Sequence, residues 1–168
     1  GSATDTFSVA NATAADLNGG GGDDTFTVTA TLTGAINGQT GTDVLDLSGL
    51  ATSDVTLAGS DADGFDSTTA SGVTSFDGIN TLTGATAGTL VGLNTNSTWN
   101  LDGTPTYNDG TNSLNFTGFT TLLQGGSMVD AFNVTADTTA NLNAGGGNDS
   151  ISIASGATLT GSVDGNTG

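Results

Sequence analysis

A glycine-rich stretch that ends in an aspartate recurs along this chain at a fixed spacing. The fullest copy, residues 19–27, reads G-G-G-G-D-D-T-F-T and fits the pattern G-G-x-G-x-D-x-U-x, where U is a large apolar residue. Looser copies start at residues 38, 125 and 144, and the aspartates fall at positions 5, 24, 43, 130 and 149. Their spacings are 19, 19, 87 and 19 residues. A short fixed period of this kind is typical of folds built from stacked repeats.

Between the turns, large apolar residues alternate with threonine, serine and asparagine, as half-buried strands require. Stacking at this period predicts two internal ladders of apolar side chains, the first formed by Phe7, Phe26, Leu45, Phe132 and Ile151, the second by Val9, Val28, Leu47, Val134 and Ile153. One coil cannot bury its apolar face alone, but stacked coils can. We therefore predict an all-β chain that forms a right-handed parallel β-solenoid (β-helix) with 19–21-residue coils, the handedness following the general crossover preference.

A longer repeat lies over the short one. Residues 130–151 match residues 5–26 at an offset of 125. We interpret 1–168 as a single continuous β-solenoid segment, with a super-repeat over 5–129 and the start of the next over 130–168.

The middle of the chain, 48–124, has no full glycine turn. Residues 71–82 resemble 111–122 at an offset of 40, which we interpret as two coils of about 20 residues. The aspartate-rich segment 60–70 is predicted to form a protruding corner. Phe65 is the only residue of this segment that is expected to insert into the core. Residues 104–112 are predicted to form a turn or a hairpin.

The charge of the chain excludes several classes of partner. The 168 residues include no Lys, Arg or His, and the formal net charge is −17. Nucleic acid has no basic residue to bind, and an anionic membrane surface would repel the chain. Direct membrane insertion is also excluded, because no apolar run approaches the ~20 residues of a spanning helix. The expected partners are cations, neighbouring repeats of the same chain, and other copies that assemble into rods or filaments.

The glycine-aspartate turns predict candidate calcium sites. Calcium takes carboxylate and backbone carbonyl oxygens, and glycine lets carbonyls point inward at backbone angles that other residues resist. Stacking pairs Asp24 with Asp43 and Asp130 with Asp149. The accessory candidates are Asp23 and the turn glycines Gly20, Gly22, Gly41, Gly145 and Gly147. The alternative is purely structural: each aspartate caps a tight turn by accepting hydrogen bonds from backbone N–H groups.

An enzyme is not expected from this composition. The absence of His, Cys, Lys, Arg and Glu removes most general bases and nucleophiles. The only concentrated carboxylates are Asp61, Asp63 and Asp66, which we interpret as a solvated loop or a weak cation site. The threonines of 25–33 alternate as on an ice-binding face, but Ser8 and Ser152 break that pattern, and outward strand positions explain them.

The glycine-aspartate turns resemble the hemolysin-type (RTX) calcium-binding repeat. The larger pattern resembles the beta-strand repeat modules of giant bacterial surface exoproteins, including filamentous-hemagglutinin-like adhesins. The stretch 93–134 carries this second resemblance, with W-N-L-D-G at 99–103, N-D-G-T at 108–111, F-T-G-F at 116–119, G-G at 125–126 and D-A-F at 130–132. The chain departs from the RTX pattern, because it has one nonapeptide per coil where RTX rolls have two, and only 19–27 fits every position.

The resemblance implies a stalk or repeat segment of a large secreted or cell-surface bacterial protein, adhesive or part of a surface layer, in which calcium would rigidify the glycine-aspartate edge. Two alternatives stay open. One is a calcium-binding module that folds on binding metal. The other is an adhesin module that binds a cell-surface glycan around 60–70 or 104–112, with Tyr107 as its exposed contact and Trp99 in the core.

Overall fold

The computed structural model describes residues 1–166. All regular secondary structure in that range is β-strand. The strands of the first half are β1 (Thr6–Val9), β2 (Leu17–Gly21), β3 (Thr25–Val28), β4 (Ala35–Thr40), β5 (Val44–Asp46), β6 (Asp54–Ser60), β7 (Phe65–Ala70), β8 (Ser75–Asp77), β9 (Thr81–Thr83) and β10 (Thr89–Val91). Those of the second half are β11 (Ser97–Leu101), β12 (Thr106–Asn108), β13 (Ser113–Thr117), β14 (Leu122–Gln124), β15 (Asp130–Val134), β16 (Thr138–Thr139), β17 (Leu142–Asn143), β18 (Ser150–Ile153), β19 (Leu159–Thr160) and β20 (Val163–Asp164). None of the described residues forms a helix able to span a membrane.

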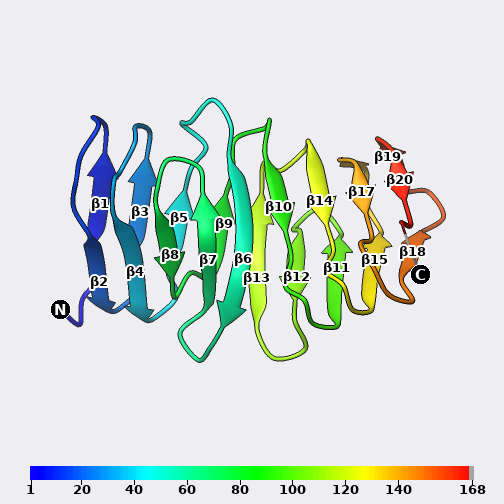
Figure 1. Ribbon diagram of the computed structural model, residues 1–168, viewed down its shortest axis with the longest axis horizontal. Coiled ribbons are helices and arrows are strands. Elements are labelled where there is room, and N and C mark those ends of the chain that lie inside the picture. The colour runs from blue at the N-terminus through cyan, green and yellow to red at the C-terminus, as the bar shows by residue number, and fades with distance from the viewer. Residues whose placement is uncertain (167–168) are drawn as a thin grey trace.

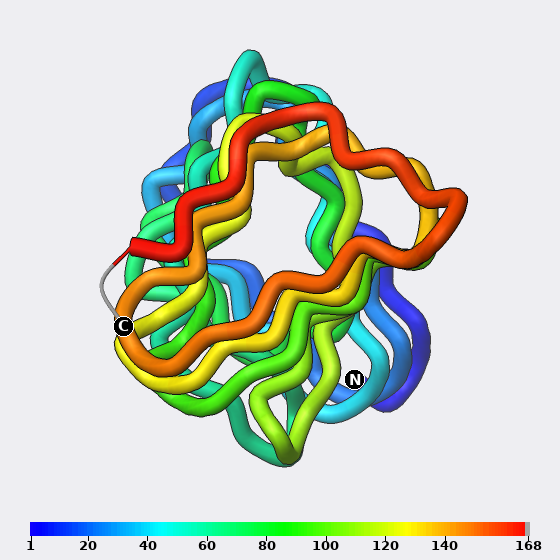
Figure 2. The backbone as a smooth tube through the Cα atoms, turned by 90° about the vertical axis from the view of Figure 1, so that its right-hand side faces the viewer, coloured from blue at the N-terminus to red at the C-terminus, as the bar shows by residue number. Residues whose placement is uncertain are grey.

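The strands lie on two main faces along one long axis, and successive passes of the backbone superimpose when viewed along it (Figures 1 and 2). One face is a nine-stranded sheet in the order β1-β3-β5-β9-β13-β12-β11-β15-β18. The other face consists of β2-β4-β8 followed by β7-β6-β10-β14-β17-β20, where β8 and β7 are joined by antiparallel bridges. A small sheet of β16 and β19 lies at one corner. The all-β prediction with parallel strands stacked in sheets is therefore confirmed.

The predicted apolar ladders form in register. Phe7, Phe26 and Leu45 are strand partners in successive layers, and Phe132 pairs with Ile151. Val9 pairs with Val28 and Val134 with Ile153 in the second ladder, but Ile153, in the last strand of the sheet, is exposed and not internal as predicted. The alternation of apolar and small polar residues places one set inside, where the side chains form a single buried core along the axis.

Two antiparallel insertions interrupt the parallel stacking, and the sequence pattern did not predict them. After β5 the chain skips two positions along the second face and forms β6. It then returns as β7, antiparallel to β6, and finally as β8, which pairs with β4. After β10 the chain makes the same excursion on the first face. It skips two positions to form β11, returns as β12, antiparallel to β11, and then forms β13, which pairs with β9. We call β6-β7-β8 and β11-β12-β13 the two meanders.

The meanders explain the 40-residue duplication. Its matched segments are β8 and β13 with their flanking turns, in which Phe76 and Phe116 are buried and Gly78 and Gly118 have positive φ. The duplication is thus a repeated meander, one on each face, and not a pair of parallel coils. Seven strands precede β15 on the first face and seven precede β17 on the second, so residues 5–129 supply seven layers.

Two predictions about the middle of the chain are wrong. The segment 60–70 is not a protruding corner, because residues 65–70 form strand β7, although Phe65 does insert into the core as predicted. Tyr107 is not an exposed contact, since it is fully buried in β12 within the hairpin predicted over 104–112. Its ring packs edge-on against Trp99, at 4.6 Å between centroids, and against Phe65 at 5.7 Å. The aromatic residues of both meanders therefore form one cluster, with Trp99 in the core as predicted.

The stacked rings of Phe7 and Phe26, 4.8 Å apart, allow a matched stability test. Phe26 is fully buried, whereas Phe7 lies in the first strand and is only partly buried. Phe26→Ala should lower the free energy of unfolding by about 3–5 kcal/mol, and Phe7→Ala by roughly 1–2 kcal/mol. Urea denaturation followed by the emission of the single buried Trp99 measures both losses. Equal losses would contradict the placement of Phe26 inside the stack.

Candidate functional site

The predicted calcium-binding aspartates line one corner of the molecule, where each precedes a strand of the nine-stranded sheet. The Asp5 amide donates to Asp24 Oδ1 at 2.7 Å, and the Asp24 amide donates to Asp43 Oδ1 at 2.7 Å. The Asp43 amide continues the series to Asn80 Oδ1 at 2.7 Å. We call the series Asp5, Asp24, Asp43 and Asn80 the first run of the aspartate ladder.

A second run forms after the second meander. The Asp130 amide donates to Asp149 Oδ1 at 2.9 Å, and the Ser97 hydroxyl donates to Asp130 Oδ1. The structure thus brings together both predicted pairs, Asp24 with Asp43 and Asp130 with Asp149. In each pair one carboxylate caps a backbone amide of the neighbouring layer, and Asp130 also caps the Gly126 amide of its own turn, as the structural alternative predicted. A short side chain suits this role, because it must span a single strand spacing of about 4.8 Å.

Asn80 and Ser97 belong to the ladder but were missed in the sequence. Asn80 follows Asp43 in space, although 37 residues separate them because β6, β7 and β8 intervene. One sequence signal could have found Asn80: like Asp43, it precedes a short strand with a central buried leucine. As an amide, it ends the run of like charges.

The first glycine of each turn makes room for the aspartate side chain. A Cβ atom built on Gly19 would lie 2.1 Å from Asp24 Oδ2, and one on Gly38 would lie 2.5 Å from Asp43 Oδ2. The same contact recurs between Gly125 and Asp130 Oδ2, at 2.5 Å. A methyl group at these positions would therefore displace the buried carboxylate.

The other candidate glycines lie where neighbouring layers meet. Gly20, Gly22, Gly41, Gly145 and Gly147 all have positive φ. A Cβ on Gly41 would come within 2.1 Å of the Gly22 carbonyl oxygen, so the layers approach through bare backbone. Gln39, the strand partner of Gly20, also adopts a positive φ of 65°, although it lacks the conformational freedom of glycine. The accessory candidate Asp23 is exposed and accepts a hydrogen bond from the Thr42 amide at 2.9 Å.

The carboxylates of the ladder differ in how they are satisfied. Asp24 and Asp43 are fully buried, and the Oδ2 atom of each has no hydrogen-bond partner; Asp149 Oδ2 is also unpartnered. Asp130 Oδ2, in contrast, accepts a hydrogen bond from the Gly126 amide at 2.8 Å. The first run therefore leaves buried carboxylate oxygens that a cation or a proton would satisfy.

Burial raises the pKa of two aspartates of the ladder, Asp43 and Asp130. Desolvation raises the pKa of Asp43, with further increases from the charges of Asp24, Asp23 and Asp63, and the Asp24 amide opposes them. Burial also raises the pKa of Asp130, as does the charge of Asp149, whereas the Ser97 hydroxyl and the Gly126 amide lower it.

A calcium ion has partial support from these donors. Asp24 Oδ2 and the Gly38 carbonyl oxygen both lie within 2.9 Å of the ideal Cβ position of Gly19, and Asp43 Oδ2 and the Gly78 carbonyl oxygen both lie within 2.5 Å of that of Gly38. Carboxylate and carbonyl oxygens are the ligands that calcium prefers, although it takes six to eight of them. In residues 1–166 no group of three or more acidic side chains gathers to hold a metal ion. Backbone carbonyls would have to supply most of the coordination.

The carboxylates Asp61, Asp63 and Asp66 lie at the turn between β6 and β7 and on β7 itself. Asp61 accepts a hydrogen bond from the Asp63 amide at 2.9 Å, and Asp66 accepts one from the Gly78 amide at 3.3 Å. Burial raises the pKa of Asp66, and so do the charges of Asp77 and Asp61. The partners of Asp61 and Asp66 are thus backbone amides, one in this turn and one just after β8.

Comparison of the chain with protein-family models, curated proteins and solved structures finds no match in any of the three. The geometry of the site and the sequence pattern therefore carry the functional argument.

The raised pKa values predict that acid stabilises the fold. A carboxyl group whose folded pKa exceeds its unfolded value of about 3.8 binds protons more readily when folded, so stability falls as pH rises through the folded pKa. Stability, measured as the melting temperature in excess chelator, should therefore increase as the pH falls from 7 toward about 4. Asp43→Asn keeps an Oδ1 acceptor and should weaken this dependence, whereas the exposed Asp102→Asn should leave it unchanged. A steeper dependence in Asp43→Asn would contradict the assignment.

Proposed function

We propose that this chain is a right-handed parallel β-solenoid, with coils of 19–21 residues outside the meanders, and that it serves as a structural repeat or stalk of a large secreted or cell-surface bacterial protein. The observation that carries this proposal is the exact register between layers 19 residues apart, in both the apolar ladder and the aspartate ladder. Side chains and backbone amides thus repeat in the direction in which the stack grows. A repeat of this kind supplies length and rigidity.

The 125-residue recurrence supports an array. The second run of the ladder restarts the first, with β15 and β18 in the roles of β1 and β3, so neighbouring repeats of the same chain are the natural partners. Composition supports an extracellular location: net charge −17 keeps a long rod soluble, and trypsin-like proteases have no Lys or Arg to cleave. The adhesive or surface-layer role rests on the sequence resemblance alone.

Small-angle X-ray scattering of tandem chains tests the rod. Duplicating residues 5–129 once and twice should lengthen the particle by a constant step, because each copy adds seven layers. At about 4.8 Å a layer, the step is roughly 34 Å, with the cross-section unchanged. A maximum dimension that grows without a constant step, or a cross-section that widens, would contradict the proposal.

We propose further that calcium rigidifies the first run without being required for folding. The unpartnered Oδ2 atoms of Asp24 and Asp43 support calcium, and the hydrogen bonds that already join the layers support folding without it.

Circular dichroism with calcium and with excess chelator separates this role from metal-driven folding. The chain should keep a β-sheet spectrum in chelator, and calcium should raise its melting temperature. The Asp24→Asn/Asp43→Asn variant should lose that rise. The control Asp137→Asn, whose exposed carboxylate caps the Thr158 amide, should keep it. Loss of the β-sheet spectrum in chelator would favour the module that folds on metal, and an unchanged melting temperature would exclude a calcium role.

A further inference from the structure

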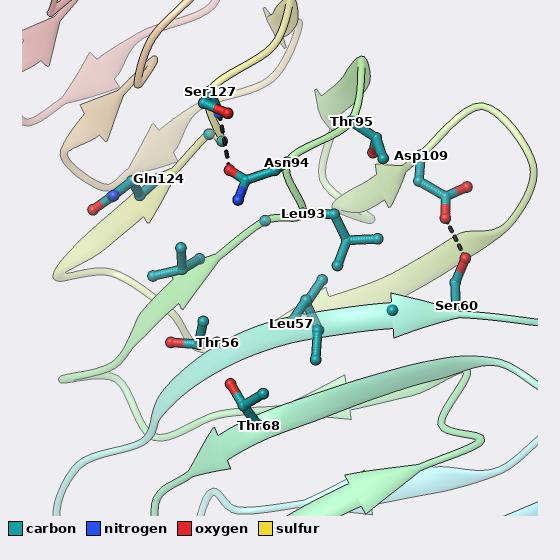
Figure 3. A pocket seen from close by; sticks show the side chains of 16 residues that line it. Thr56, Leu57, Ser60, Thr68, Leu93, Asn94, Thr95, Asp109, Gln124 and Ser127 are labelled. Carbon is teal, nitrogen blue, oxygen red and sulfur yellow. Dashed lines mark hydrogen bonds between the residues drawn. The ribbon is translucent and has the colours of Figure 1, made fainter.

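A groove of about 670 Å³ opens on the second face where the two meanders meet (Figure 3). β6 runs to Ser60, but its pairing with β10 ends at Thr56 and Val91, after which the chain leaves the sheet. The second half of β6, residues 57–60, therefore has β7 on one side and the groove on the other. The loop after β10 and the turn after β14 form the opposite wall.

The walls of the groove are fixed by hydrogen bonds. The Leu93 amide donates to the buried Tyr107 hydroxyl at 2.8 Å, and Asn94 Oδ1 accepts from the Ser127 amide at 3.1 Å. On the other side, the Ser60 hydroxyl donates to Asp109 Oδ2 and joins β6 to the tip of the second meander (Figure 3). A ligand would therefore meet a preformed surface, which lowers the ordering cost of binding.

The lining is polar but almost uncharged. The side chains of Thr56, Thr68 and Gln124 border the groove and make no hydrogen bond to another group within residues 1–166. Leu57 and Leu93 lie beneath the groove, where both side chains are largely buried in the core (Figure 3).

The only carboxylate in the lining is already occupied. Burial alone would raise the pKa of Asp109, but hydrogen bonds from the Asn112 amide, the Ser60 hydroxyl and the Thr111 amide lower it below its usual value. Asp109 is thus an ionised structural group of the wall and has little capacity left for a cation.

We propose that this groove binds a neutral oligosaccharide. Hydroxyl and carboxamide groups such as those of Thr56, Thr68 and Gln124 exchange hydrogen bonds with sugar hydroxyls. Anionic glycans are excluded by the charge of −17 and the absence of any basic residue in the chain. The groove shares Gly125 and Gly126 with the turn that holds Asp130, but none of the ladder aspartates lines it, and it adds ligand binding to the structural role.

Nuclear magnetic resonance titration of the ¹⁵N-labelled chain tests the site. The probes are the neutral hexasaccharides of cellulose, laminarin, mannan and chitin, the heparin hexasaccharide, and an uncharged alternating Thr–Val heptapeptide. At least one neutral hexasaccharide should shift the amides of Gly59, Ser60, Gly92 and Gly126 in a saturable manner. The heparin fragment should not.

Two variants make the test specific. Ala58 is exposed and lines the groove, so Ala58→Trp should weaken sugar binding at least about tenfold by filling it. Ala10→Trp, at an exposed position outside the groove, should bind as the parent chain does. Gln124→Leu removes a carboxamide at little change in volume and should also weaken binding. The native pattern of Trp99-region resonances verifies folding in each case.

The proposal is overturned if no neutral hexasaccharide shifts these amides. Full affinity in folded Ala58→Trp and Gln124→Leu variants would also overturn it, as would equal binding of the heparin fragment. Preferential binding of the heptapeptide would instead identify the edge of β6 as a strand-pairing site for protein partners.

Discussion

The hydrogen bond from a backbone amide to an aspartate of the next layer is the interaction on which this structure depends. In a stack of short strands, the first amide of each strand lies at a corner, where regular ladder pairing has not begun. Asp24, Asp43 and Asn80 each accept such an amide from the preceding layer. The interaction also explains how a chain without any basic side chain holds 17 carboxylates, since backbone amides replace salt bridges as partners for many of them. The glycines beside the ladder are its steric counterpart, because the carboxylates fill the space that a methyl group would take.

This arrangement places negatively charged carboxylates at the same corner of successive layers, which is electrostatically unfavourable. Stacked carboxylates repel one another, and burial adds a desolvation penalty that raises the pKa of Asp43 and Asp130. The carboxylates resolve the conflict differently: protein donors satisfy both oxygens of Asp130, whereas Asp24, Asp43 and Asp149 each keep one oxygen without a partner. If a cation serves the rod, these oxygens are where the protein leaves an opening for it, and the first run has two of them in adjacent layers.

The sequence predicted those parts of the fold that repeat at one fixed interval. Strand alternation and the 19-residue period were sufficient to pair Phe7 with Phe26 and Asp24 with Asp43. They could not predict the meanders, because a strand that pairs antiparallel carries the same alternation as one that pairs parallel, and only the partner differs. Because the antiparallel strands β7 and β12 were not foreseen, the segment 60–70 was expected to protrude and Tyr107 was expected to be exposed. Asn80 escaped notice because its partner is close in space and 37 residues away in the chain.

The meanders also determine how such a rod would respond to a pulling force. In a simple stack, each layer touches only those before and after it in sequence, so the chain could peel away one coil at a time. Here β11 lies beyond β12 and β13, although it precedes both in the chain, and β6 lies beyond β7 and β8. Tension that reaches either meander acts on three layers that are joined to one another. A hydrogen bond from Ser60 to Asp109 also links the two meanders. A rod built from such units would therefore contain blocks of layers that extend together, and its resistance to stretching would be divided into a few large steps.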